Sequence, residues 1–437
     1  MTNFERIPRS AQEQELLDRA AHILPASART PTMSLDSAII VKEGRGSKLR
    51  DLSGNEYIDY LLGSGPMFVG HCHPAVVAAA HEAIDHGSSY LLPNEAAVLL
   101  ADAIVKETPC AERVAYGSTG SDAAFFALRL ARAYRKRDKI LKFEGGYHGQ
   151  TDHAMMSNQW TKQPADYPTP VPNSEGIPAA TAGDVLVAPY NDIDRAASLI
   201  EANADDLGAV IVEPMQRTVT PREGFLEGLR EVTRRLDIPL VFDEVVTGFR
   251  FGLGSAQGYY GVTPDLTAMG KSLSAGHPLS VVCGNDELMQ YGAGVRRLTG
   301  DYVAMTGTFS GNAVSCAVGL AVIKELQKEG VYEALFARGR RLSEAVASAC
   351  EKNDIPCQIA GEPPAFEPWF TDQPVVDYRS SMTADPKLTY GFAQALFNRG
   401  ILKAHEKFFI SIVHSDEDID VTIDAMGEAA EEIAANR

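Results

Sequence analysis

From residue 112 onward, the hydrophobic positions alternate between two spacings. Short apolar runs typical of buried strands occupy Arg113–Gly117, Lys139–Phe143, Asp184–Ala188, Gly208–Glu213, Pro239–Phe242 and Ser280–Cys283. Between them, apolar residues recur at helical spacing over 121–135, 192–204 and 223–236. Strands that alternate with helices in this way predict an α/β fold, in which a mostly parallel sheet is covered on both faces.

The two ends of the chain have a different pattern. Residues 38–60 alternate apolar and polar positions around a turn at 51–55, which predicts a hairpin. After residue 330 helical and strand-like stretches alternate again, with a Pro-rich loop expected at 363–368. The Pro, Thr and Ser residues of 157–182 predict a mobile loop. Further helices are expected at 11–24, from Pro74 to about Ile84, at 313–328 and from Ser415 onward.

Length and charge narrow the class of protein. At 437 residues the chain exceeds one hydrophobic core, so two or more lobes are expected. The formal net charge of −18 argues against nucleic acid or an anionic membrane as a partner. There is no run of about 18 apolar residues and no apolar signal core, so we expect no membrane span and no signal peptide. The six cysteines lack a CxxC pair, which is typical of reduced thiols in a cytoplasmic protein.

Lys271 is the first candidate for chemistry. It follows the apolar run 266–269 and precedes a Ser/Gly loop. A lysine is costly to bury, but a desolvated amine has a lowered pKa and can condense with an aldehyde. Asp243 ends the apolar strand 239–242, where a carboxylate can pair with the ring nitrogen of pyridoxal phosphate and keep it protonated. Taken alone, each residue would be interpreted as exposed; together with the motifs below they predict a pyridoxal phosphate site.

Three turns rich in Gly, Ser or Thr are candidates for binding such a ligand. The string 118–124 follows a strand and opens a helix, so its backbone N–H groups suit a phosphate, although a plain helix N-cap has the same pattern. Strings 143–149 and 306–312 carry Tyr147 and Thr308, which are suited to ring stacking and to a phosphate contact respectively. Core packing remains an alternative interpretation for 143–149, and a simple helix N-cap remains one for 306–312. Neighbours such as His71, Cys72 and His73 point in different directions, so no metal site is expected there.

These strings together resemble the class III, fold-type I pyridoxal-phosphate-dependent aminotransferases, and within them the glutamate-1-semialdehyde 2,1-aminomutase branch. The resemblance covers nearly the whole chain, and Phe242–Arg250 followed by Gly270-Lys271 is its most specific part. It implies a large cofactor-binding domain at 76–328. It also implies a smaller α+β domain, built from an N-terminal segment at 1–75 and a C-terminal segment at 329–437.

The resemblance implies a role for each matching residue. Lys271 would form the internal aldimine and move the proton, and Asp243 would pair with the pyridine nitrogen. Val245 and Tyr147 would lie on opposite ring faces, with His148 beside the tyrosine. The residues implied for the phosphate are Thr119, Gly120 and Ser121, and Thr308 would reach the phosphate of a partner subunit, which implies a homodimer with shared active sites.

Several positions depart from the aminomutase pattern. Met33 stands where that branch has an arginine that grips the substrate carboxylate, and Arg29 lies nearby. Ser64 replaces a tryptophan, and Thr218 replaces an asparagine, with Arg217 adjacent. Because methionine cannot imitate an arginine–carboxylate fork, these changes argue against the mutase substrate.

The sequence therefore predicts a cytoplasmic class III aminotransferase that moves an amino group from an amine or amino acid donor to a keto or aldehyde acceptor. An intramolecular 2,1-aminomutase and a pyridoxal-phosphate racemase are the alternatives on the same fold. The substrate candidates are Met33, Ser64 and Arg217.

Overall fold

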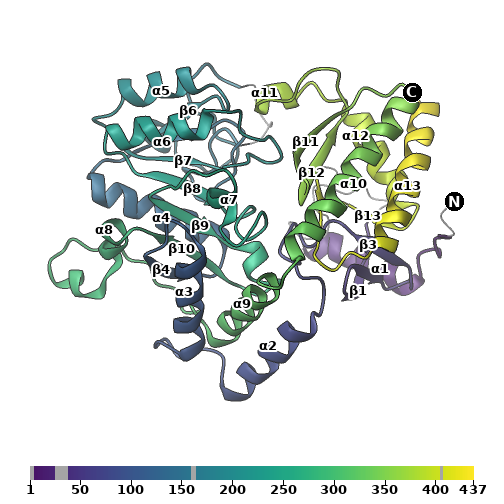
Figure 1. The fold of residues 1–437 in the computed structure, drawn as a ribbon, viewed down its shortest axis with the longest axis horizontal. Helices are drawn as coiled ribbons and strands as arrows, with labels where there is room; N and C mark the ends of the chain where they lie inside the picture. The colour runs from purple at the N-terminus through teal and green to yellow at the C-terminus, as the bar shows by residue number, and fades with distance from the viewer. Residues whose placement is uncertain (1–3, 25–37, 159–163, 404–406) are drawn as a thin grey trace. The chain divides into compact units, whose positions relative to one another are not determined.

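The computed structural model describes residues 4–24, 38–158, 164–403 and 407–437, and the chain divides into two compact units (Figure 1). The central unit comprises Ala75–Lys328 and Val376–Tyr378. The terminal unit comprises Met1–Pro74, Glu329–Val375 and Arg379–Arg437.

A seven-stranded sheet forms the centre of the central unit, in the order β4-β10-β9-β8-β7-β5-β6. Its strands are β4 (Arg113–Gly117), β5 (Lys139–Phe143), β6 (Val185–Ala188), β7 (Leu207–Val212), β8 (Leu240–Glu244), β9 (Leu266–Met269) and β10 (Ser280–Gly284). Neighbours pair in parallel except β10, which runs antiparallel to both β4 and β9. The other six strands therefore have their carboxyl ends at one edge of the sheet.

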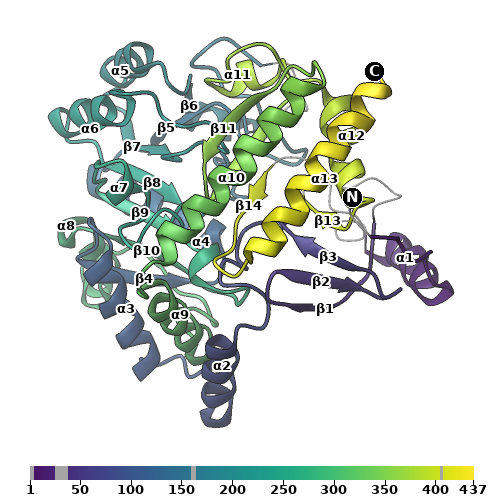
Figure 2. The ribbon, with the colours of Figure 1, turned by 45° about the vertical axis from the view of Figure 1, so that its right-hand side comes forward.

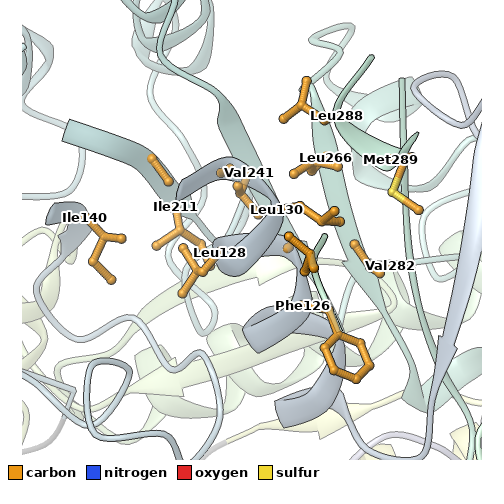
Figure 3. Close-up of a cluster of buried hydrophobic side chains, with 14 of the residues drawn as sticks. Phe126, Leu128, Leu130, Ile140, Ile211, Val241, Leu266, Val282, Leu288 and Met289 are labelled. Atoms are coloured by element: carbon orange, nitrogen blue, oxygen red, sulfur yellow. The ribbon is translucent and has the colours of Figure 1, made fainter. Parts of the chain in front are cut away.

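Helix α4 (Gly120–Arg135) covers one face of this sheet. Its Phe126, Leu128 and Leu130 are buried against apolar side chains of several strands, as Figure 3 shows. The neighbours that Figure 3 labels are Ile140, Ile211, Val241, Leu266, Val282, Leu288 and Met289. Alternate strand residues point to the other face. There, Phe143 packs edge-on against Phe225 of α6 (Phe225–Arg235) with ring centroids 5.5 Å apart.

The remaining helices of the central unit lie around this sheet or beside one another. Helices α3 (Glu95–Glu107) and α9 (Ala313–Leu326) pack together, as do α5 (Ile193–Ala202) and α6. The others are α2 (Pro74–His86), α7 (Ser255–Tyr259) and α8 (Asp286–Met289), with short 3-10 helices at Ala179–Asp184, Lys271–Leu273, Gln290–Gly292 and Gly294–Leu298.

The terminal unit joins the two ends of the chain (Figure 2). One sheet has the order β1-β2-β3-β13, in which Ile401 of β13 pairs in parallel with Ile58 of β3. Its strands are β1 (Val41–Arg45), β2 (Lys48–Asp51), β3 (Glu56–Asp59) and β13 (Ile401–Leu402), and the second sheet holds β11 (Gln358–Glu362), β12 (Ala365–Trp369) and β14 (Phe408–Phe409). Helices α10 (Val331–Lys352) and α12 (Pro386–Phe397) both contact α13 (Asp416–Ala435). Helices α1 (Ala11–Ile23) and α11 (Tyr378–Ser381) complete the described elements.

One expectation about elements needs correction and another is confirmed. The Pro-rich loop expected at 363–368 is wrong for most of its length, because residues 365–368 belong to β12. Pro368 pairs with Ile359 of β11 and lies beyond the two residues of β12 that pair with β14, so its missing N–H costs no bond to β14. The hairpin expected over 38–60 is confirmed, because β2 and β3 pair antiparallel on either side of the turn at 51–55, and β1 adds a third antiparallel strand.

Residues 157–182, expected to form a mobile loop, contain no strand or α-helix among the residues that the structure describes, and a 3-10 helix begins at Ala179. Residues 159–163 lie outside the described ranges, and the mobility of the loop stays a prediction. In the described part of the chain, no helix is long and apolar enough to cross a membrane.

Candidate active site

Most candidate residues of the central unit lie at or after the carboxyl ends of strands in the seven-stranded sheet. Ser118 follows β4, and the loop with Tyr147 and His148 follows β5. Asp243 lies near the end of β8, and Lys271 follows β9. Because these ends meet at one edge of the sheet, the fold gathers residues that are far apart in the sequence at the place where open α/β sheets bind ligands.

Asp243 is held by hydrogen bonds to both carboxylate oxygens. His148 donates from Nδ1 to Oδ2 at 2.8 Å, and the backbone N–H of Val245 donates to Oδ1 at 3.1 Å. Both side chains are almost fully buried. The other ring nitrogen of His148, Nε2, is buried and has no hydrogen-bond partner among the described residues. The sequence placed His148 beside Tyr147, but did not predict that it orients Asp243.

Two glycines allow the surrounding loops to approach the first turn of α4. A Cβ on Gly120 would lie 2.8 Å from Cγ1 of Val245. A Cβ on Gly149 would lie 2.7 Å from Cα of Ser121, and Gly149 also has a positive φ of +92°. The structure therefore brings Gly120, Ser121 and Val245 together with the loop of His148.

The start of α4 combines an N-cap with exposed donors. Thr119 Oγ1 accepts from Asp122 N, and the Asp122 carboxylate accepts from the N–H groups of Ser118 and Thr119. The N-cap interpretation of this string is thus correct for Thr119. The first turn still directs the positive end of the helix dipole outward, with Gly120 and Ser121 at its start, which suits an anion.

Tyr147 is fixed through its backbone and its ring. Its N–H donates to Glu213 Oε1 at 2.7 Å, and the guanidinium of Arg217 lies over its ring, 5.4 Å from the centroid. Arg217 is half-buried and donates from Nε to the carbonyl of Gly145 at 3.1 Å. Its own N–H donates to the second oxygen of Glu213 at 3.2 Å, so Glu213 links the two segments.

Lys271 begins a short 3-10 helix with a positive φ of 39°. A non-glycine residue in this region is strained, and such strain is concentrated at functional sites. The next residue, Ser272, is buried and accepts a hydrogen bond from Nη2 of the buried Arg250 at 2.9 Å. Lys271 itself is half-buried, whereas the sequence interpretation relied on burial of its amine.

Among the lysines that the structure describes, Lys142 is fully buried, and it was not one of the candidates predicted from the sequence. Its Nζ donates to the carbonyls of Gly146, Ala154 and Met156 at 2.6 to 2.9 Å. A signal was present in the sequence: Lys142 lies two residues after Ile140 in β5, so both side chains point to the face that α4 covers.

Thr308 lies in the segment that precedes α9. It is exposed and lines a hollow of the central unit together with Tyr90, Leu91 and Asn94. None of the other implied cofactor residues lines this hollow.

The substrate candidates are distributed differently. Arg217 lies at Tyr147, and Thr218 beside it is fully buried. Ser64 is exposed in a turn of the terminal unit with a φ of 68°. Met33 and Arg29 lie outside the described residues.

Comparison with known proteins identifies the family. The family model for class III aminotransferases matches residues 30–428. The chain belongs to the class III aminotransferases. Glutamate-1-semialdehyde 2,1-aminomutase 2 of Brevibacillus brevis is 38% identical over 426 residues, covering 95% of this chain and 97% of that protein. These aminotransferases are pyridoxal phosphate enzymes of fold type I, and this chain is one of them.

Two solved structures extend the comparison. An omega-transaminase from Sphaerobacter thermophilus superposes with a TM-score of 0.91 at 31% identity, covering 99% of this chain and all of that one. A β-phenylalanine aminotransferase from Variovorax paradoxus has a TM-score of 0.86 at 26% identity, covering 97% of this chain and 94% of that one.

The residues of the site fit pyridoxal phosphate. A buried carboxylate held by a histidine suits the protonated ring nitrogen, and a helix start free of side-chain bulk suits the phosphate. The hydroxyl of Ser280 is buried and has no hydrogen-bond partner in the described ranges. It lies close to Gly117, because a Cβ added to Gly117 would be 2.6 Å from this hydroxyl. This places an additional polar atom between the ends of β4 and β9.

Proposed function

We propose that this chain is an intermolecular aminotransferase that uses Lys271, Asp243, His148 and Tyr147 at the carboxyl edge of the central sheet. The observation that carries the proposal is the buried Asp243–His148 pair, 2.8 Å apart, on the strand next to the one that Lys271 follows. A carboxylate fixed in this way is what a protonated pyridine nitrogen requires.

Bound pyridoxal phosphate supplies an aldehyde that accepts an amine and a ring that draws electrons from the donor carbon. The chain's own residues bind, orient and move a proton. The first turn of α4, at Gly120 and Ser121, binds the phosphate, while Tyr147 and Val245 hold the two faces of the ring. Asp243 keeps the proton on the ring nitrogen, and Nζ of Lys271 carries the proton that leaves the donor carbon.

The reaction type follows from a test for a separate acceptor. Purified protein with the cofactor is offered amines and β-amino acids, each with and without pyruvate or 2-oxoglutarate. We expect donor consumption to continue beyond one turnover when an acceptor is present and to stop after one turnover when it is absent. Continued turnover without an acceptor would overturn the proposal.

An intramolecular 2,1-aminomutase is the second candidate, because the 38% identity to a protein of that name extends over 426 residues. Against it stand Met33 in place of the carboxylate-gripping arginine and the Arg217-Thr218 pair after β7. The decisive measurement offers glutamate-1-semialdehyde alone: rapid formation of 5-aminolevulinate would establish the mutase.

We propose that Arg217 recognises the carboxylate of a donor or of the keto acceptor. Its guanidinium lies over the ring of Tyr147, and its hydrogen bonds to two carbonyls fix it in place. Replacing Arg217 with Met should raise KM for carboxylate-bearing substrates by roughly 10- to 100-fold, because a hydrogen bond between charged groups is lost. KM for amines without a carboxylate should not change. Arg222→Met, at an exposed position five residues on, is the control.

We propose a homodimer with shared active sites. The hollow of Thr308 is lined by apolar side chains that are strongly exposed, among them Leu91 at 81% and Leu92 at 72%, and Phe309, next to Thr308 in the chain, is 64% exposed. An exposed apolar patch of this kind supports a protein–protein contact. A second copy fits, because the family resemblance assigns Thr308 to the partner's phosphate, and none of the other implied cofactor residues lines the hollow of Thr308.

Mixing two defective variants tests this arrangement. Lys271→Ala and a Thr308 variant that retains cofactor poorly are combined under conditions of subunit exchange. If Thr308 serves the partner, each mixed dimer has one site with both defects and one with neither, so activity returns. If it serves its own subunit, every site keeps a defect and no activity returns.

We propose a cytoplasmic location. Support comes from the six cysteines, all of which are free thiols in the structure. Localisation of the tagged full chain by fractionation tests this.

A further inference from the structure

Lys142 is fully buried, and nothing in the proposed reaction uses it. Its ammonium has three hydrogens, and each has one acceptor: the carbonyls of Gly146 at 2.9 Å, Ala154 at 2.9 Å and Met156 at 2.6 Å. A neutral amine has two hydrogens and a lone pair, so one of these carbonyls would lose its donor. The arrangement therefore suits a lysine that is charged.

The three carbonyls belong to one loop. Gly146 directly precedes Tyr147 and His148 on the outgoing arm, whereas Ala154 and Met156 lie on the returning arm. The arms meet again where Gly145 N donates to the carbonyl of Ser157 at 2.7 Å. The Lys142 ammonium therefore binds both arms of the loop, before and after the residues assigned to the cofactor ring.

We propose that Lys142 is a positioning residue, whose ammonium fixes the loop 144–157 so that Tyr147 and His148 meet the cofactor. The inference rests on the proposed function for the roles of these two side chains. Strand β5 pairs with β6 and β7, and β7 pairs with β8, so the sheet sets the position of Lys142 relative to Asp243.

The environment of Lys142 makes its hydrogen bonds to the loop sensitive to pH. Burial lowers the pKa of the Lys142 ammonium to about 7, the carboxylates of Glu213 and Asp243 raise it, and Arg217 lowers it. As pH rises through this value, the folded protein loses the proton and with it one of the three hydrogen bonds. The loop should therefore loosen on the alkaline side.

The test compares holoenzymes of Lys142→Met and Lys142→Arg with the wild type. Lys139→Met is the matched control, because Lys139 lies on the same strand but pairs with Asp206 at the surface. The readouts are the visible circular dichroism of bound cofactor and the rate of cofactor release. Loss of hydrogen bonds from a charged donor should speed release by roughly 10- to 100-fold in Lys142→Met and weaken the dichroism. Arg should restore part of both, and the control should match the wild type.

Wild-type dichroism and release rates in Lys142→Met would overturn the inference. If that variant does not fold, hydrogen exchange of the wild type decides. After correction for intrinsic rates, exchange in 144–157 should rise between about pH 6 and about pH 9, while β7 stays constant. An equal response in both segments would also overturn the inference. A wild type that binds cofactor but transfers no amino group would refute the proposed function alone, because neither readout depends on turnover.

Discussion

Asp243 shows at the scale of one residue how the fold prepares a carboxylate for its task. Both of its oxygens accept hydrogen bonds, from His148 and from Val245 N. Asp243→Asn has one side-chain oxygen, so it can accept from only one of these two donors, and its neutral amide cannot stabilise a protonated ring nitrogen. We expect the half-reaction with an amine donor to slow by about 100-fold or more, a typical cost of losing a preorganised charge.

Stopped-flow measurement of that half-reaction checks the prediction. The control is Asp192→Asn, which changes a carboxylate at the surface N-cap of α5 and should leave the rate unchanged. Asn158→Asp is unsuitable as a control, because Arg217 donates a hydrogen bond to residue 158. A half-reaction of wild-type speed in Asp243→Asn would show that Asp243 is not the partner of the ring nitrogen.

Lys271 should carry the cofactor covalently. Its backbone is held at φ 39° by the short helix after β9, which points to a fixed direction for the side chain. Borohydride reduction of the holoenzyme followed by peptide mapping should place the phosphopyridoxyl group on Lys271. Lys271→Ala should bind the cofactor without a reducible bond and lose turnover. A label on Lys142 would contradict both this prediction and the positioning role of Lys142.

At the scale of elements, the contact between the loop of His148 and helix α4 depends on Gly149. Gly149→Ala would place Cβ 2.7 Å from Cα of Ser121, and backbone cannot move aside cheaply. We expect a loss of about 1–3 kcal/mol in stability together with weaker cofactor binding. Gly176→Ala is the control, because Gly176 has a similar φ of +86° but nothing within 4 Å of the added Cβ.

Titration with cofactor, together with urea unfolding, separates the two effects. Backbone strain at positive φ should appear in both variants, and the defect in cofactor binding should appear in Gly149→Ala alone. Equal cofactor affinity in the two variants would mean that the Gly149–Ser121 contact does not shape the phosphate site.

How much the sequence predicts differs between elements for physical reasons. Six of the seven strands of the central sheet were predicted within a residue or two, because buried strands have continuous apolar runs, and β9 was identified only as the apolar run before Lys271. The reversed direction of β10 was not predicted, since apolar content is the same in either direction. Pro368 suggested a loop where β12 lies, because a proline is tolerated in β12 only since the short β14, which lies far away in the sequence, ends before reaching it.

The candidate site shows the same limit. Lys271 and Asp243 follow strand ends, so their convergence was predictable from the fold class. The bond between His148 and Asp243, and the acceptors around Lys142, depend on how loops return to the sheet, and loop geometry leaves little periodic signal in the sequence.

At the scale of the whole molecule, His414 couples the terminal unit to pH. Its fully buried ring stacks on Tyr60 at 4.4 Å, and Nδ1 accepts from Ser411 N. Burial lowers the pKa of His414 to about 4, although Asp418 and Asp59 raise it. Between the ordinary histidine pKa of about 6.5 and about 4, the unfolded chain binds a proton that the folded unit does not, so stability is lost as pH falls.

This histidine should cost the terminal unit about 2 kcal/mol between about pH 7 and about pH 5. His414→Phe keeps the stacked ring without a titrating nitrogen, so its unfolding free energy should lack this part of the pH dependence, although its stability at neutral pH should be lower. Urea unfolding of the full chain at both pH values measures the difference, with the exposed His22→Phe as control. Identical slopes for His414→Phe and the wild type would contradict the assignment.

The terminal unit can finish folding only when both ends of the chain have been synthesised. Ser47 donates to Asp418 across 371 residues of chain, and β3 pairs with β13 over a similar separation. A ribosome adding about 5–20 residues per second needs roughly 20 to 75 seconds to deliver that partner. Throughout this interval the edge of β3 that β13 will cover is exposed, while the central unit can already fold. A nascent chain of this enzyme therefore depends on protection of its first strands until its last helix has been made.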